Sequence, residues 1–154
     1  MKHLIIFVVI IIGVIFLTLI SRYDDLYNAM TNNYNNIYLE NSKIGGKLGR
    51  GVFANKNFNN EDIIERAPYI EDKTSNFSGL IRDYIFTKSE INSIVAFGFG
   101  SLYNHSDNPN AMWRINGDYL EIIATKPINK DEEILISYGK TYWNSRKDSI
   151  KKLD

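Results

Sequence analysis

Two stretches carry most of the information in this chain: N-H-S-D-N-P-N at residues 104–110 and E-E-I-L-I-S-Y-G at residues 132–139. A third, L-G-R-G-V-F-A, lies upstream at residues 48–54. Each stretch alone is weak evidence, because glycine pairs and a tyrosine beside a turn occur in many proteins. All three in this order on one chain form a pattern that is far more specific than any single stretch.

The composition excludes several kinds of protein. A chain of 154 residues is long enough for one compact domain and a short extension. Its 18 basic and 18 acidic side chains cancel, so no global positive field favours direct binding of nucleic acid. It has no cysteine, which excludes disulfides, thiolate catalysis and cysteine-ligated zinc. Its two histidines lie far apart in sequence, so we expect no metal site.

Short strands separated by turns dominate the pattern after residue 43. No alternation of strands and helices supports a doubly wound nucleotide-binding fold. We expect one or two helical turns at residues 89–96 and a mainly β domain elsewhere. The expected strands are an extended run from residue 52, residues 63–66 ended by Pro68, residues 119–124 and residues 134–136, with turns or loops at 57–62, 72–79 and 129–131.

The chain starts with an apolar run. Leu4 to Ile20 carries no charge, and its 17 residues would span roughly 26 Å as a helix, close to the thickness of a thin bilayer. We expect residues 1–22 to be an uncleaved transmembrane helix, with a secretory signal peptide as the alternative. Residues 23–40 are predicted to be a polar tether or flank, and residues 146–154 a charged C-terminal tail.

The three stretches resemble the signature segments of the SET domain, a family that transfers a methyl group from S-adenosylmethionine to a lysine side chain. The resemblance predicts a SET domain at residues 41–145. It implies a fold of several short-stranded sheets with a C-terminal pseudoknot, in which the end of the chain passes through a preceding loop. Without cysteines the chain cannot build the zinc-bound cluster of many relatives, and it is similar to compact, viral-type SET proteins.

The resemblance assigns the cofactor to two of the stretches. Gly49, Arg50 and Gly51 match the family's glycine pair, whose backbone N–H groups meet the methionine end of S-adenosylmethionine. The amide of Asn104 is expected to meet the amino-acid end, and the backbone of His105 the adenine. Without the resemblance, the glycines would be read as a tight turn and the histidine as a structural side chain.

The remaining roles follow from the third stretch and its neighbours. Tyr138 matches the tyrosine that stands where cofactor and lysine meet, so it is the expected catalytic residue. Trp143 is expected to stack on the adenine, to anchor the C-terminal segment, or to do both. Tyr84 resembles a tyrosine of the lysine channel. Ser137 stands at a position that is often acidic, and Asp131 replaces a frequent glycine but tolerates the same turn conformations.

The expected activity is methyl transfer to the ε-amine of a protein lysine, with S-adenosylmethionine as donor and no metal. The expected partner is a lysine-containing protein, with histones among the candidates. Positive charges slightly favour a cytosolic N-terminus. The need for cytosolic cofactor outweighs this and places the catalytic domain on the cytosolic side of the membrane. The alternatives are a silent SET-like interaction module anchored to a membrane, and a structural membrane protein.

Overall fold

The computed structural model describes residue 13 and residues 16–20, 35–44 and 49–145. The chain divides into two compact units, Met1–Asn35 and Asn36–Asp154. In the first unit the described residues are helical. No helix formed by the described residues is long and apolar enough to cross a membrane. Most of the apolar run predicted as an anchor, most of the tether and the charged tail lie outside the described residues.

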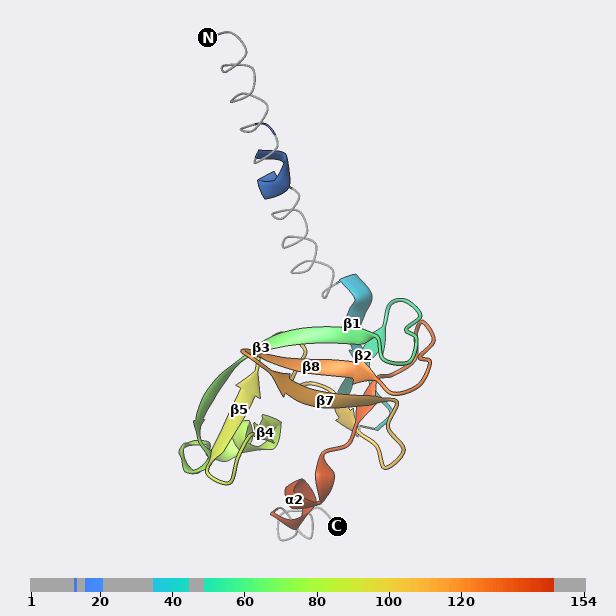
Figure 1. Ribbon diagram of the computed structural model, residues 1–154. Helices are drawn as coiled ribbons and strands as arrows, with labels where there is room; N and C mark the ends of the chain where they lie inside the picture. Colours follow the sequence, from blue (N-terminus) through green and yellow to red (C-terminus); the bar gives the residue numbers. More distant parts are fainter. Residues whose placement is uncertain (1–12, 14–15, 21–34, 45–48, 146–154) are drawn as a thin grey trace, which may run out of the picture. The chain divides into compact units, whose positions relative to one another are not determined.

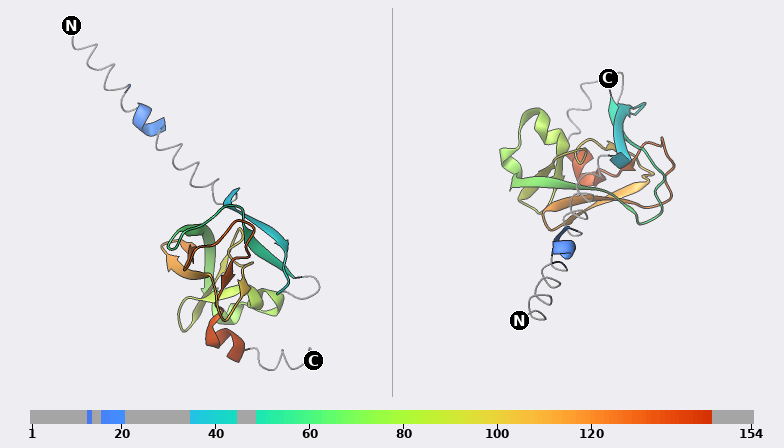
Figure 2. Two further views of the ribbon diagram at one scale, coloured as in Figure 1. Left: turned by 90° about the vertical axis from the view of Figure 1, so that its right-hand side faces the viewer. Right: turned by 90° about the horizontal axis from the view of Figure 1, so that it is seen from above.

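The second unit is mainly β, as predicted (Figure 1). Its strands form a two-stranded sheet β1-β2, a five-stranded sheet in the order β4-β5-β3-β8-β7, and a two-stranded sheet β6-β9. Figure 2 shows the β1-β2 hairpin, in cyan and teal, as a part separate from the larger sheet. The bounds are β1 Ile37–Asn41, β2 Arg50–Ala54, β3 Ile63–Lys73, η2 Thr74–Asn76, η3 Gly79–Tyr84, β4 Ile85–Thr87, β5 Asn92–Ala96, β6 Asn104–His105, β7 Ala111–Asn116, β8 Tyr119–Ala124, β9 Leu135–Ile136 and α2 Gly139–Asn144, where η denotes a 3₁₀ helix.

The long strand β3 corrects two predictions. It does not end before Pro68 but continues to Lys73, through the start of the segment predicted as a loop at 72–79. Up to Pro68 the strand pairs with β8, and from Tyr69 onward it pairs with β5. Pro68 therefore stands where the strand changes partner. At this position the missing N–H of Pro68 does not interrupt the hydrogen bonds between strands. Its carbonyl accepts the N–H of Phe97 at 2.8 Å.

The helical turns predicted at residues 89–96 are also absent. Residues 92–96 form β5, which is paired on both sides, with β3 and with β4. Ile94 is fully buried and is followed by a second β-branched residue, Val95. Such side chains suit a central strand better than a short helix, and pairing on both edges overrides the weak local helical signal.

Parallel pairing of β6 with β9 places the signature stretches 104–110 and 132–139 side by side. Asn104 lies opposite Leu135, and His105 lies opposite Ile136. The strand predicted at 134–136 is thus confirmed as the two-residue strand β9. The turn before it contains Asp131 with φ 67°, the left-handed conformation expected for a residue in place of glycine. The threading of the pseudoknot stays a prediction.

Candidate active site

Tyr138 follows β9 and is held at two points by the segment around β6. Its backbone N–H donates to Nδ1 of His105 at 3.1 Å, and its hydroxyl donates to the carbonyl of Tyr103 at 2.7 Å. Because Nδ1 of His105 accepts a hydrogen bond, the neutral ring carries its proton on Nε2, which lies 3.2 Å from Asp107. The ring and hydroxyl of Tyr138 are therefore oriented by residues 103–105.

The Tyr138 hydroxyl stays protonated at neutral pH. Burial raises the pKa of Tyr138 to about 12, and Tyr142, Tyr84 and Glu133 add to the increase because a Tyr138 phenolate would be repelled by their ionised forms. The group therefore acts as a hydrogen-bond donor to the Tyr103 carbonyl and offers its oxygen lone pairs to a ligand. It is not poised to remove a proton as a phenolate base.

A second feature surrounds Gly51, which is buried in β2. The Asn104 side-chain amide donates to the Arg50 carbonyl at 2.9 Å and to Oε1 of Glu133 at 2.8 Å. The other oxygen of Glu133 accepts the Ser42 hydroxyl at 3.0 Å. A Cβ atom on Gly51 would lie 2.8 Å from Cδ of Glu133 and 2.9 Å from Nδ2 of Asn104, closer than real Cβ atoms approach.

A glycine is needed at position 51 because two side chains lie close to its backbone, and not because the backbone has an unusual conformation. Gly51 does not have a positive φ, so the alternative of a tight turn is wrong for this residue. Both N–H groups of the Asn104 amide are occupied by acceptors, which fixes the amide and leaves Oδ1 for a ligand. Gly49 binds the N–H of Ser42 through its carbonyl at 2.9 Å, and Arg50 enters the network through its own carbonyl.

The aromatic rings of Tyr142 and Trp143 pack against Tyr138. Trp143, on α2, lies edge-on to His105 with ring centroids 4.9 Å apart and nearly parallel to Tyr138 at 6.1 Å. Tyr142 packs against Tyr138 at 4.6 Å. Trp143 nevertheless keeps 37% of its surface exposed. The ring contacts agree with an anchor for α2, and the exposed part of Trp143 leaves the predicted stacking on adenine possible.

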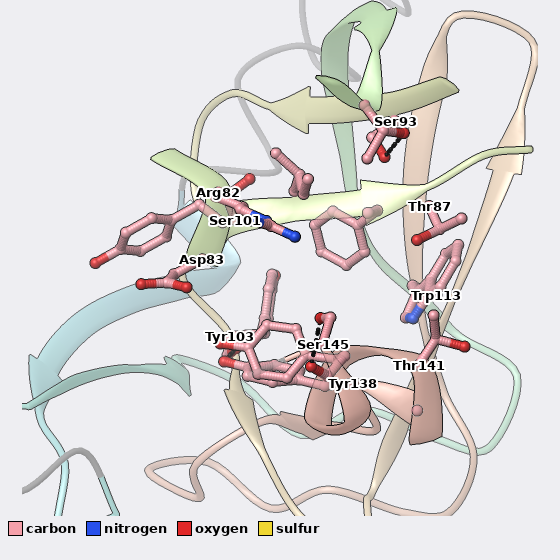
Figure 3. A pocket seen from close by; sticks show the side chains of 16 residues that line it. Arg82, Asp83, Thr87, Ser93, Ser101, Tyr103, Trp113, Tyr138, Thr141 and Ser145 are labelled. Carbon is pink, nitrogen blue, oxygen red and sulfur yellow. Dashed lines mark hydrogen bonds between the residues drawn. The ribbon is translucent and has the colours of Figure 1, made fainter. Parts of the chain in front are cut away.

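A cavity of about 340 Å³ opens between α2, η3, β4 and β5. In Figure 3 Tyr138 and Tyr103 lie at one side of it and Ser93 at the other. Trp113 and Phe86 meet edge to face, with centroids 5.2 Å apart. The aromatic residues that line the cavity are Tyr84, Phe86, Tyr103, Trp113, Tyr138 and Tyr142.

The cavity contains Tyr84 as well as Tyr138, which agrees with the expected lysine channel. It is not lined by the other predicted residues, Gly49, Arg50, Gly51, Asn104, His105 and Trp143. Tyr138 belongs to both neighbourhoods: it borders the cavity, and it contacts His105 and Trp143. A reaction between a group in the cavity and a group near Asn104 and His105 would therefore take place beside Tyr138.

Sequence reasoning missed four residues of this region: Glu133, Tyr103, Phe86 and Trp113. The Glu132-Glu133 pair carried a signal, since an acidic pair next to a buried strand needs partners. Phe86 and Trp113 gave none, because aromatic residues in strands are common and only the tertiary structure brings these two together.

Glu65, on β3, is a buried carboxyl in the same part of the molecule. It is 2% exposed and accepts the Phe99 N–H at 3.0 Å and the Tyr103 hydroxyl at 2.8 Å. Burial raises the pKa of Glu65 to about 7, although both hydrogen bonds oppose the increase. The folded protein therefore holds this proton more tightly than the unfolded chain does.

This pKa predicts a measurable dependence of stability on pH. Because the folded pKa is raised, the contribution of Glu65 is most favourable below about pH 4.5 and is lost as the pH rises to about 7. Glu65→Gln cannot titrate. We expect the free energy of unfolding of the wild type, relative to Glu65→Gln, to fall by about 3 kcal/mol between pH 4 and pH 8. Urea titrations of both proteins across this range test it, and a constant difference would contradict the raised pKa.

The comparisons with known proteins agree with this fold and site. A family model described as the SET domain matches residues 49–139. A histone-lysine N-methyltransferase of Schizosaccharomyces pombe, specific for H3 lysine-37, is 29% identical over 104 residues, which are 63% of this chain and 71% of that protein.

Three solved structures share the architecture. A candidate histone methyltransferase of Plasmodium falciparum is 33% identical with a TM-score of 0.60, over 71% of this chain and 98% of that one. The methyltransferase domain of human PR domain-containing protein 2 is 16% identical with a TM-score of 0.54, over 67% and 76%. ctPRC2, in an autoinhibited conformation bound to S-adenosylmethionine, is 17% identical with a TM-score of 0.58, over 77% and 17%. The last two show the fold alone.

The chain belongs to the SET-domain family, since the family match covers more than half of its length. Its activity is that of an S-adenosylmethionine-dependent protein-lysine methyltransferase. The predicted family, the mainly β SET fold and the predicted class of enzyme are confirmed.

Proposed function

We propose that the chain methylates a lysine of a histone or similar protein, with Tyr138 at the reacting centre. The observation that carries this proposal is the position of Tyr138, which borders the aromatic cavity on one side and contacts His105 and Trp143 on the other. The substrate lysine would enter through the cavity, and the methyl donor would lie on the side of Asn104 and His105.

The residues on the donor side fit S-adenosylmethionine. Gly51 lets the Glu133 carboxylate and the Asn104 amide approach its backbone where a Cβ would collide with them, and the amide held in this way keeps Oδ1, which can accept from an ammonium group. His105 and Trp143 supply an aromatic surface for a planar base. When bound, S-adenosylmethionine supplies an activated methyl group on a sulfonium. Gly51 and Asn104 would hold its amino-acid end, and Trp143 would cover its base.

The cavity would prepare the lysine for attack. A solvated lysine has a pKa near 10.4, so only about one molecule in a thousand is neutral at pH 7.4. Aromatic walls that exclude water lower this pKa and favour the neutral amine. The hydroxyl of Tyr138, fixed by its bond to the Tyr103 carbonyl, would accept from the amine N–H and aim its lone pair at the methyl group. The lysine ammonium would lose its proton to solvent before the transfer.

A transfer assay tests the proposed function. The protein is incubated with radiolabelled S-adenosylmethionine and a mixture of histones and other proteins, and mass spectrometry locates the methyl groups. We expect methyl groups on lysine, with histones among the labelled proteins. A silent interaction module would transfer nothing, and methyl groups found only on arginine or on nucleic acid would overturn the lysine assignment.

Trp143→Ala separates the two roles of the tryptophan. We expect an approximately tenfold loss of S-adenosylmethionine affinity, because a stacked face contributes about 1–2 kcal/mol. The melting temperature should change little, since Trp143 is more than a third exposed. Calorimetric titration and thermal unfolding of the same preparation measure both quantities. Normal affinity with a collapsed melting temperature would show that Trp143 only anchors α2.

We also propose that residues 1–22 anchor the protein in a membrane, with the catalytic unit on the cytosolic side. The uncharged run from Leu4 to Ile20 supports this proposal. The full chain should remain with membranes after high-salt and alkaline extraction, whereas a fragment that starts at Tyr23 should be soluble and folded. Recovery of uncleaved full-length chain in the soluble fraction would refute the anchor.

A further inference from the structure

A buried carboxyl is connected to the proposed reacting centre through one residue. The carbonyl that holds the Tyr138 hydroxyl belongs to Tyr103, and the Tyr103 side chain binds Glu65 through its own hydroxyl at 2.8 Å. Tyr103 is 1% exposed and Glu65 is 2% exposed. Among the described residues, no ion pair of Glu65 with a basic side chain is formed.

Packing alone does not account for Glu65. Burial of a carboxyl without a cation is costly, and an apolar side chain would fill the same volume without that cost. The two hydrogen bonds of Glu65 show what the carboxyl does instead. One oxygen accepts the N–H of Phe99 and the other accepts the hydroxyl of Tyr103, so the carboxyl joins the two ends of the 99–103 segment.

The 99–103 segment ends at the carbonyl that orients Tyr138. Within it, the N–H of Leu102 donates to the carbonyl of Phe99 at 2.7 Å, which makes a tight turn. Glu65 binds this turn from the core side through Phe99 and Tyr103. The position of the Tyr103 carbonyl is thus influenced by a side chain that comes from β3 and does not itself line the cavity.

We propose that Glu65 is a positioning residue for methyl transfer, which fixes the Tyr138 hydroxyl through the side chain and carbonyl of Tyr103. This inference rests on the proposed role of Tyr138. A small displacement of the carbonyl would tilt the hydroxyl and misalign the amine, which lowers the rate of transfer without changing the donor side. If Glu65 acts through Tyr138, disrupting the bond between Glu65 and Tyr103 should lower turnover only in protein that has the Tyr138 hydroxyl.

A double-mutant cycle on the full chain tests the proposal. Tyr103→Phe removes the hydroxyl bound by Glu65 and keeps the ring and the carbonyl. We expect Tyr103→Phe to lower kcat about tenfold in the wild-type background and less than twofold in the Tyr138→Phe background, with S-adenosylmethionine affinity unchanged in both. The matched control is Tyr69→Phe. It removes a hydroxyl that donates to the Gly117 carbonyl and accepts from Lys88, none of these residues lines the cavity, and kcat should stay unchanged.

The outcomes separate this inference from the proposed function. If Tyr138→Phe itself keeps wild-type turnover, the proposed role of Tyr138 fails. If Tyr138→Phe is slow but Tyr103→Phe lowers kcat equally in both backgrounds, only the role of Glu65 fails. Should Tyr103→Phe not fold, Glu65→Gln takes its place in the same cycle, because the amide keeps the size and one acceptor oxygen.

A second measurement does not depend on turnover. In protein labelled with ¹³C at Cζ of tyrosine, the signal of Tyr138 is identified by its loss in Tyr138→Phe. Tyr103→Phe or Glu65→Gln should shift this signal at neutral pH, because the hydrogen bond to the Tyr103 carbonyl changes. Tyr69→Phe should not shift it. An unchanged Tyr138 signal in both variants would overturn the proposal.

Discussion

Tyr138→Phe should slow methyl transfer by about a hundredfold or more while the affinity for S-adenosylmethionine stays within about threefold. The substitution keeps the ring, so the packing against His105, Tyr142 and Trp143 survives. It removes the hydroxyl that binds the Tyr103 carbonyl and that would orient the amine. That contact is worth most in the transition state, where the amine must lie in line with the methyl group.

The measurement is single-turnover transfer on an identified substrate, combined with calorimetric titration of the cofactor. Asn104→Ala is the opposite case and should weaken cofactor binding first, since it removes Oδ1 and the bonds to Arg50 and Glu133. Tyr119→Phe, on an exposed tyrosine, controls for the loss of a phenol hydroxyl. Wild-type turnover of correctly folded Tyr138→Phe would remove the hydroxyl from the mechanism.

The sequence predicted those parts of the fold in which local and tertiary preferences agree. Residues 119–124 form the predicted strand β8, because this apolar run bounded by turns also occupies an interior position of the sheet, between β3 and β7. The prediction at 89–96 was wrong because pairing of β5 on both edges decides its structure. The end predicted before Pro68 was wrong because a proline is tolerated where β3 changes partner.

The sequence predicts Tyr138 between the cofactor-binding residues and Tyr84, and in the structure Tyr138 lines the cavity with Tyr84 and contacts His105 and Trp143. The roles of these residues stay predictions. The supporting residues could not be predicted in the same way. Glu133 precedes β9 and Glu65 lies in β3, and nothing in the sequence tells which donor each carboxyl meets. The wall formed by Phe86 and Trp113 depends on β3, which pairs with β5 and with β8 and so joins the strand pair β4-β5 to the strand pair β7-β8 in one sheet.

Gly51→Ala should weaken S-adenosylmethionine binding by about a hundredfold, equivalent to about 2.7 kcal/mol. The new Cβ would lie 2.8 Å from Cδ of Glu133 and 2.9 Å from Nδ2 of Asn104, so the carboxylate or the amide must move. Either movement breaks the bond between the two side chains and releases the Asn104 amide from the orientation that leaves Oδ1 for the cofactor. β2 lies in a hairpin with β1, so the fold should survive with a modest loss of stability.

Gly117→Ala is the matched control, because it tests backbone strain without a steric conflict. Gly117 has φ +56° and no atom within 4 Å of an added Cβ, so its substitution should lower the melting temperature and leave cofactor affinity unchanged. Gly51→Ala should instead lower cofactor affinity in calorimetric titration and change the melting temperature little in thermal unfolding. If folded Gly51→Ala binds the cofactor as tightly as the wild type, the contact of Gly51 with Glu133 and Asn104 does not form the cofactor site.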